Sequence, residues 1–298
     1  MEKLAVCSVV TKDFLIYLKV FCASIIKYTK NFDRDYIVYY FGNDLFDDDF
    51  IELKRLYSKF IFKKVNEEKY YALNKVSNHK NTPKRTKEIK KFAYARIEMF
   101  KETFYDQIIY FDTDMVAIND LSPLFKMRFK NGIIACEDVL VKQYNLVSKE
   151  VFERDHKVQG GVILAGKEIL NQKVYEELLE RLKFHGEYRM NDQTLFTEYF
   201  GSRGLLKTLD VKFNCGRKLI RDNLIRKKDV YIIHYPGSGK PFDLKTQKSN
   251  FSCYVYDYWH KVRIELQGGN IFYKNFSKFI IYLKRIKKKI FFLIGIKI

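Results

Sequence analysis

Short apolar runs alternate with stretches of helical periodicity along the first part of the chain. Mostly apolar runs at residues 4–10, 36–41 and 60–65 predict buried strands. Between them, apolar side chains recur at helical spacing over residues 14–28 and 50–60, which predicts two helices. This alternation predicts a parallel sheet with right-handed crossover connections. No Gly-x-Gly-x-x-Gly motif follows the first run, so the fingerprint of a dinucleotide-binding fold is absent.

Residues 66–90 interrupt this alternation. They are polar and basic, and they predict a long loop or a frayed helix. Two interpretations stay open for this segment: a solvated surface stretch, or a mobile lid near an anionic substrate. A helix over residues 89–103 is then expected to lead into a buried strand at residues 107–111.

Further elements are expected downstream, with no internal repeat and no clear interdomain linker. Gly160 and Gly161 lie in one predicted strand and would allow a ligand to approach the backbone closely. A proline-initiated helical turn is expected within residues 118–125. The other predicted strands span residues 132–136, 158–164, 205–213 and 230–234, and the other predicted helices span residues 168–184 and 191–200.

Two carboxylates, Asp112 and Asp114, directly follow the strand at residues 107–111. Ligands of open α/β sheets bind just past the carboxyl ends of such strands, so we expect both acids at the rim of a site. An Asp-x-Asp pair there can hold one hard divalent cation, which can bridge substrate phosphates. A rival interpretation is a haloacid-dehalogenase-type phosphatase with Asp112 as nucleophile. That family places the motif near the start of its domain, whereas about a hundred residues precede it here.

A second informative stretch runs from His234 to Phe242, with the sequence HYPGSGKPF. Its histidine ends a predicted strand, and a neutral imidazole is a competent metal ligand. The glycine-rich loop that follows can present backbone N–H groups to phosphate, and Lys240 adds a positive charge. Each feature alone is common in structural turns, but their joint spacing indicates an anion-binding site.

The composition indicates a folded chain with an excess of positive charge. Of the 298 residues, 47% are hydrophobic, which is ample for a packed core. The five cysteines are scattered without metal-like spacing, which favours free thiols in a reducing compartment. With neither a signal-peptide pattern nor a run long enough to span a bilayer, the expected location is cytoplasmic.

The net charge of +19 is concentrated toward the carboxyl end of the chain. Eight basic residues and no acid occur among residues 274–297, and removing these eight charges leaves +11 for the rest. Apolar residues recur there at helical spacing, so we expect a basic amphipathic helix lying on an anionic membrane. A helix packed on the core is the other interpretation. Nucleic acid is not the expected partner, because no recognition motif accompanies the charge.

Four motifs together resemble glycosyltransferase family 8, the family of glycogenin and the bacterial lipooligosaccharide galactosyltransferases. They occur in the order YAR at residues 94–96, FDTDM at 111–115, NDQ at 191–193 and HYPGSGKPF at 234–242. The resemblance covers about residues 4–245. It implies a GT-A fold, an α/β architecture with a Rossmann-like nucleotide-binding half and a mostly parallel central sheet flanked by helices. The expected division is a catalytic domain over residues 1–250 and a basic, membrane-associating helical tail over 251–298.

The resemblance also implies roles for individual residues. Asp112, Asp114 and His234 would hold Mn²⁺ or Mg²⁺. Arg96 and Asp192 would bind hydroxyls of the donor sugar, and Gln193 would lie near the anomeric carbon. The remaining donor-binding positions are Val10, Thr11 and Lys12 at uridine, Gly237 and Lys240 at the diphosphate, and Thr113, Gln159 and Gly160 elsewhere in the site.

Two positions depart from the family's pattern. Gln159 stands where relatives often have Asn, which lengthens the amide at the donor sugar, and Lys12 replaces a common Asn beside the base. No well-placed nucleophile accompanies the acids, because Gln193 is a poor one. Front-face substitution therefore fits retention at the anomeric carbon better than a covalent glycosyl intermediate does.

The expected activity is a retaining, metal-dependent hexosyl transfer from UDP-glucose or UDP-galactose. The acceptor would be a glycan or glycolipid of the lipopolysaccharide or surface-polysaccharide type, at the inner face of a membrane. The dehalogenase-type phosphatase stays open as a rival and predicts no use for His234. A non-catalytic membrane or nucleic-acid binder is the second rival and predicts no metal-dependent binding of UDP.

Overall fold

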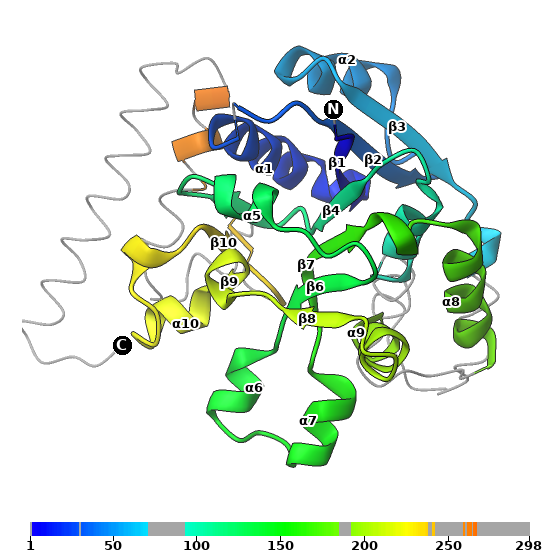
Figure 1. The fold of residues 1–298 in the computed structure, drawn as a ribbon. Helices are drawn as coiled ribbons and strands as arrows, with labels where there is room; N and C mark the ends of the chain where they lie inside the picture. Colours follow the sequence, from blue (N-terminus) through cyan, green and yellow to red (C-terminus); the bar gives the residue numbers. More distant parts are fainter. Residues whose placement is uncertain are drawn as a thin grey trace, which may run out of the picture.

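The structure is a computed structural model that describes residues 2–29, 31–70, 93–184, 192–237, 240–241, 259, 261–263 and 265–266. Figure 1 shows a central sheet with helices on both faces and a pair of short helices, α6 and α7, extending beyond it. The larger sheet has seven strands in the order β3-β2-β1-β4-β7-β6-β8. A smaller sheet has three strands in the order β5-β10-β9.

The first half of the large sheet is parallel, as the alternating pattern predicted. Strands β1 and β2 pair in parallel, and so do β2 with β3 and β1 with β4. The strands are β1 Leu4–Val10, β2 Asp35–Phe41, β3 Phe60–Val65 and β4 Gln107–Phe111, with helices α1 Leu15–Lys27 and α2 Asp47–Leu56 as crossovers. The predicted strands of this half are confirmed almost residue for residue, whereas α2 begins earlier than expected.

The second half of the large sheet changes direction. Strand β7 pairs antiparallel with both β4 and β6, and β8 runs parallel to β6. The bounds are β6 Ile133–Cys136, β7 Gln159–Gly166 and β8 Leu206–Thr208. Four of the six strand pairings are therefore parallel, which confirms a mostly parallel sheet. The long strand predicted for residues 205–213 is wrong, because only β8 forms and a 3-10 turn, Val211–Phe213, follows.

The small sheet lies where the two informative stretches of the sequence meet. Strand β10, Ile232–His234, is its central strand. It pairs antiparallel with β5, Met115–Ala117, and parallel with β9, Cys215–Gly216. The apolar pattern predicted β10 but not its two partners, because strands of two or three residues carry too little periodicity to be recognised.

Helices cover both faces of the large sheet. Alternate residues of β1 and β4 face opposite sides, so Ile108 and Tyr110 join one apolar cluster while Ile109 and Phe111 join the other. Helices α1 and α2 cover the cluster that contains Ile109 and Phe111. The cluster that contains Ile108 and Tyr110 is covered by α8, α9 and the 3-10 helix η2, Ala95–Lys101.

The remaining helices are mostly short. The helix predicted over residues 89–103 is a 3-10 helix in the described part of the chain, Ala95–Lys101, and α9 continues into a π-helical turn, Thr197–Gly201. The α-helices not yet placed are α5 Ser122–Lys126, α6 Val139–Gln143, α7 Lys149–Asp155, α8 Gln172–Phe184, α9 Asp192–Phe196 and α10 Arg217–Arg221. Further 3-10 turns are η1 Lys12–Phe14, η3 Lys167–Ile169 and η6 Lys227–Asp229.

Two predicted segments fall largely outside the described residues. Of residues 66–90, the structure describes 66–70, and of the tail it describes residue 259 and parts of 261–266. Trp259 is buried and lies against Tyr17 of α1, with ring centroids 5.5 Å apart. None of the helices formed by the described residues combines the length and the apolar character that crossing a membrane requires.

Candidate active site

The two carboxylates lie at the carboxyl end of β4, in the link to β5. The backbone N–H of Asp112 donates a hydrogen bond to the carbonyl of Gly161 in β7, at 2.9 Å. Asp114 accepts a backbone hydrogen bond from Tyr235, which follows β10, at 3.0 Å. Both acids are therefore tied to neighbouring strands by their backbones, and Asp114 and the intervening Thr113 are buried.

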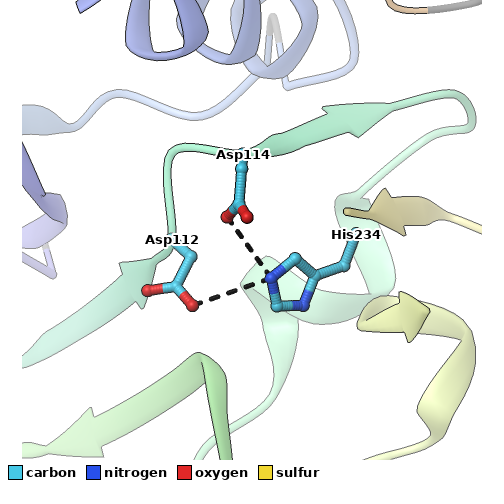
Figure 2. A group of neighbouring side chains, drawn as sticks. All are labelled: Asp112, Asp114 and His234. Carbon is cyan, nitrogen blue, oxygen red and sulfur yellow. Dashed lines mark ion pairs between the residues drawn. The ribbon is translucent and has the colours of Figure 1, made fainter. Parts of the chain in front are cut away.

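His234 comes to these acids through strand pairing. It lies opposite Met115 in the β5–β10 register, so its side chain is beside the residue that follows Asp114. Its Nε2 atom is 3.3 Å from an Asp114 carboxylate oxygen and 3.7 Å from one of Asp112, as Figure 2 shows. One ligand atom from each of the three residues lies within 4.8 Å of the others. The predicted convergence of two distant motifs is confirmed.

A fourth residue, Asn214, completes the surroundings of the imidazole. Its Oδ1 atom lies 2.8 Å from Nδ1 of His234, on the side of the ring away from the acids. No motif of the sequence marks Asn214. It follows the segment 205–213, and the NCG sequence at 214–216 gains significance only from the pairing of β9 with β10.

Lys240 supplies a positive charge at the same place. Its ammonium group donates to Asp114 and, at 2.8 Å, to the carbonyl of Tyr235. Burial opposes ionisation of Asp114, but the attraction of His234 and Lys240 outweighs it and lowers the pKa of that carboxyl below its ordinary value. Asp114 is therefore held as a carboxylate, the form that binds a cation.

Arg96 and Asp192 form a second cluster next to the first. The guanidinium donates to the carbonyl of Gly160, lies 3.0 Å from Asp192 and donates to Asp112 at 3.3 Å. Tyr110 donates its hydroxyl to the same Asp112 oxygen at 2.9 Å. Asp112 thus connects the two clusters, with one oxygen toward Arg96 and the other toward His234.

Burial governs the charge of Asp192. Removal from water raises its pKa, the attraction of Arg96 lowers it, the nearby Asp112 raises it, and the result is about 6. The ion pair does not cancel the cost of burial, because Arg96 divides its attraction between two carboxylates. Arg96 itself loses hydration on burial, yet the surrounding acids hold its pKa above the ordinary value.

Side chains of the site pack against the glycines of β7. The close approach of a ligand to this backbone stays a prediction, and the packing is a further role for these glycines. A Cβ on Gly160 would lie 1.9 Å from Arg96 Nη1 and 2.8 Å from Asp192 Oδ2. A Cβ on Gly161 would lie 2.8 Å from both Asn214 Oδ1 and His234 Cε1. A larger residue at either position would displace a side chain of the site, because the two clusters pack directly on the strand.

The other predicted site residues lie around this centre. Val10 ends β1 in the apolar cluster that includes Met115. Thr11 is partly exposed and Lys12 is exposed, with its ammonium group 5.3 Å from the centroid of the Phe46 ring. Gln159 pairs with Cys136 at a β-bulge, and Gly237 has a left-handed φ of 69°. The side-chain oxygen of Gln193 is buried and has no hydrogen-bond partner within the described part of the chain.

The donor set fits a divalent cation. Two carboxylates and one imidazole nitrogen are suitable for Mn²⁺ or Mg²⁺. Nδ1 of His234 faces the side-chain oxygen of Asn214, which can only accept a hydrogen bond. Nε2, on the side of the acids, is then available as a ligand of the cation. Three protein ligands leave positions open for substrate oxygens.

Comparisons with known proteins agree on the fold. The structure resembles the galactosyltransferase LgtC in complex with donor and acceptor sugar analogues, with TM-score 0.62, 16% identity, and coverage of 87% of this chain and 95% of that one. It also resembles the glycosyltransferase GlyE of Streptococcus pneumoniae, with TM-score 0.63, 13% identity, and coverage of 94% and 64%. No curated protein sequence matches the chain.

The bifunctional glycosyltransferase WbbM gives a similar match, with TM-score 0.64 and 18% identity over 90% of this chain. This chain spans about half, 51%, of the length of WbbM. These similarities define the class as a GT-A fold. The sequence profile of glycosyl transferase family 8 matches residues 5–245, and the chain belongs to that family. It is therefore a glycosyltransferase, and the dehalogenase-type phosphatase is not its class.

Proposed function

We propose that the chain transfers a hexose from a UDP-sugar, UDP-glucose or UDP-galactose, with retention at the anomeric carbon. The observation that carries this proposal is the convergence of Asp112, Asp114 and His234, whose ligand atoms lie within 4.8 Å of one another. A GT-A fold whose Asp-x-Asp motif and distant histidine share one cluster is suited to a sugar donor whose leaving group is a nucleoside diphosphate, which a cation held there would stabilise.

The leaving group is stabilised at this cluster. Bound to Asp112, Asp114 and His234, Mn²⁺ or Mg²⁺ would supply positive charge against the negative charge that develops on departing UDP. Lys240 adds a mobile positive charge beside Asp114, and its four-carbon stem allows the ammonium group to turn from the carboxylate toward phosphate. Gly237, three residues before Lys240 in the sequence, has a left-handed φ of 69°, which glycine adopts without strain.

The sugar is oriented at the second cluster. Arg96 and Asp192 are buried and already paired, so their positions are set before the donor arrives. Gln159 and Gly160 begin the strand beside them, and Thr113 lies between the two acids. Val10, Thr11 and Lys12, at the end of β1, would contact the uridine.

We infer front-face substitution, with Gln193 near the reacting face of the anomeric carbon. Among the residues that the structure describes, the buried side-chain oxygen of Gln193 has no hydrogen-bond partner, so it can accept a hydrogen bond from the sugar. An amide is a weak nucleophile, so its role is polar support and not attack. Isolation of a covalent sugar adduct on the protein would contradict this mechanism.

The test is Mn²⁺-dependent hydrolysis of a panel of UDP-sugars by the full chain. Asp114→Ala should lower the rate by ~10²–10³, in line with the loss of one electrostatic stabiliser of a transition state. Asp120→Ala, which removes an exposed acid six positions along the chain, serves as the matched control and should hydrolyse normally. Equal activity of the two variants, or release of phosphate from simple esters, would overturn the proposal.

We further propose that residues 1–250 form the catalytic domain and that the basic segment 251–298 attaches it to the inner face of an anionic membrane, where the acceptor is a glycan or glycolipid. The support is the cluster of eight basic residues without an acid among residues 274–297, together with helical spacing of apolar residues. Removal of the residues after Gly269 should release the protein from anionic vesicles while transfer to a soluble acceptor persists. Retained vesicle binding would refute the attachment.

A further inference from the structure

We propose that Asn214 is a positioning residue that holds His234 in the single tautomer able to bind the metal. The inference rests on the proposed function, because it concerns the same cation site. It adds a residue that no motif of the chain marks and that makes its contact with the ring of His234 opposite the ligand atom.

The first step is the direction of the hydrogen bond. Oδ1 of Asn214 lies 2.8 Å from Nδ1 of His234, and an amide oxygen can only accept. Nδ1 must therefore carry a proton. When the ring is neutral, the lone pair of Nε2 points toward Asp112 and Asp114, at 3.7 and 3.3 Å from their nearest oxygens. The opposite tautomer would place an N–H group where the cation must bind.

The second step is the burial of the amide. Asn214 is fully buried, and its Nδ2 group has no hydrogen-bond partner among the described residues. An apolar side chain of similar size would avoid this unpaired donor, so packing alone does not explain an amide here. The contact with His234 does explain it.

The third step is the rigidity of the support. Asn214 directly precedes β9, which pairs with β10 so that Cys215 lies opposite Ile233 and Gly216 opposite His234. The backbone N–H of Asn214 also donates to the carbonyl of Val211 at 2.9 Å. The residue that accepts the hydrogen bond thus directly precedes a strand that is hydrogen-bonded to the strand of the histidine that donates it.

The fourth step is the close packing of Gly161 against Asn214 and His234. Gly161 of β7 lies against both side chains, and a Cβ there would approach Asn214 Oδ1 and His234 Cε1 to 2.8 Å each. The imidazole is consequently held from three sides, by Asn214, by Gly161 and by its own strand. An amide suits this place better than a third carboxylate, because two acids already repel each other at the site.

The first experiment is binding of Mn²⁺ alone, followed by the electron paramagnetic resonance signal of the free ion. Asn214→Ala should weaken binding about 10–100-fold, the usual effect of removing a partner of a ligating histidine. Asn214→Asp keeps an acceptor and should bind within about threefold of the native chain. Asn119→Ala is the matched control, because Asn119 donates to Val230 just before β10 without touching His234, and it should bind normally.

The second experiment reads the tautomer directly in the metal-free protein. At a pH where the ring is neutral, the ring ¹⁵N shifts of His234, one of only five histidines in the chain, should show the proton on Nδ1 in the native chain and in Asn214→Asp. In Asn214→Ala they should show a mixture of both tautomers. A neutral ring with its proton on Nε2 in the native chain overturns the proposal even if every variant fails to fold.

The outcomes separate this inference from the proposed function. If His234→Ala binds Mn²⁺ as well as the native chain does, the metal site itself is wrong. If His234→Ala loses binding while Asn214→Ala keeps both native affinity and the native tautomer, the metal site stands and the role of Asn214 is refuted.

Discussion

Two clusters of polar side chains lie against consecutive glycines of β7, and they differ in how their charges are balanced. Against Gly161 are His234 and Asn214, with the acids Asp112 and Asp114 facing the imidazole. This is the imidazole cluster. Against Gly160 are the side chains of Arg96 and Asp192, which form the arginine cluster. Asp112 is shared, with one oxygen directed to each.

In the arginine cluster the positive charge of Arg96 balances the nearby carboxylates, whereas the imidazole cluster brings together groups that can bind a cation. Arg96 lies between two carboxylates and stays charged, so little further charge is needed there. In the other cluster, two carboxylates and an imidazole nitrogen converge, and Lys240 contacts Asp114. The difference teaches that changes in the arginine cluster should act first on folding stability, and changes in the imidazole cluster first on metal affinity.

The largest expected effect on stability comes from Arg96→Leu. It leaves Asp192 buried without its partner, and such a loss typically lowers the free energy of unfolding by about 3–5 kcal/mol. Chemical denaturation of the variant and the native chain measures this. The double change Arg96→Leu with Asp192→Leu should recover part of the loss.

The matched control for Arg96 is Arg226→Leu, which breaks the ion pair with Asp229 on the surface. The Arg226 side chain is 73% exposed, so this variant should lose no more than about 1 kcal/mol. Equal losses in the two variants would show that the buried pair is not what stabilises the arginine cluster.

The next effect is a pH dependence from Asp192. Its pKa rises from 3.8 to about 6 on folding, so between these values the folded chain binds more protons than the unfolded chain. The free energy of unfolding should therefore fall as the pH rises from 4 to 7, by about 3 kcal/mol from this group. Asp192→Asn should remove that part of the slope in metal-free buffer. Parallel stability curves for the two proteins would contradict the raised pKa.

A smaller effect, on metal affinity, is expected from Gly161→Ala. The new methyl group would displace His234 or Asn214, and Mn²⁺ affinity should fall about 10-fold or more while the fold persists. Gly160→Ala is the companion variant, because its methyl group meets Arg96 instead. It should lower the unfolding free energy before it lowers metal affinity. A reversed order of effects would break the distinction between the two clusters.

The smallest effect should come from Tyr110→Phe. This change removes one of the two donors to Oδ1 of Asp112, while Arg96 still holds that oxygen at 3.3 Å. We expect only about a threefold loss of Mn²⁺ affinity, below the range for losing a ligand's sole support. A loss as large as that of Gly161→Ala would mean that Arg96 alone does not hold Asp112 in place for metal binding.

The first half of the fold was predictable because its signals are local. Strands β1 to β4 are each five to seven residues long, and their apolar runs stand out from the helices between them. Strands β5 and β9 have three and two residues, and their existence depends on pairing with β10. The predicted strand over residues 205–213 was too long because the extent of β8 depends on pairing with β6, which involves only residues 206–208.

The candidate site was predictable in part. Asp112, Asp114 and His234 follow buried strands, and their order along the chain resembles that of a known family. Asn214 carries no such signal, because an asparagine in a turn is common and its use depends on β9 lying beside β10. The packing role of Gly160 and Gly161 was also hidden, since glycine in a strand shows that something lies close but not what.

The amino-acid order by itself determined the alternating parallel half, the family of the chain and the residue types available to bind a cation. These properties follow from short-range periodicity and from motifs within a few residues. Only the tertiary structure decided that Asp112 serves two clusters, that Asn214 faces the ring of His234, and that the glycines admit side chains. Those contacts join residues far apart in sequence, and sheet order and strand register bring them together.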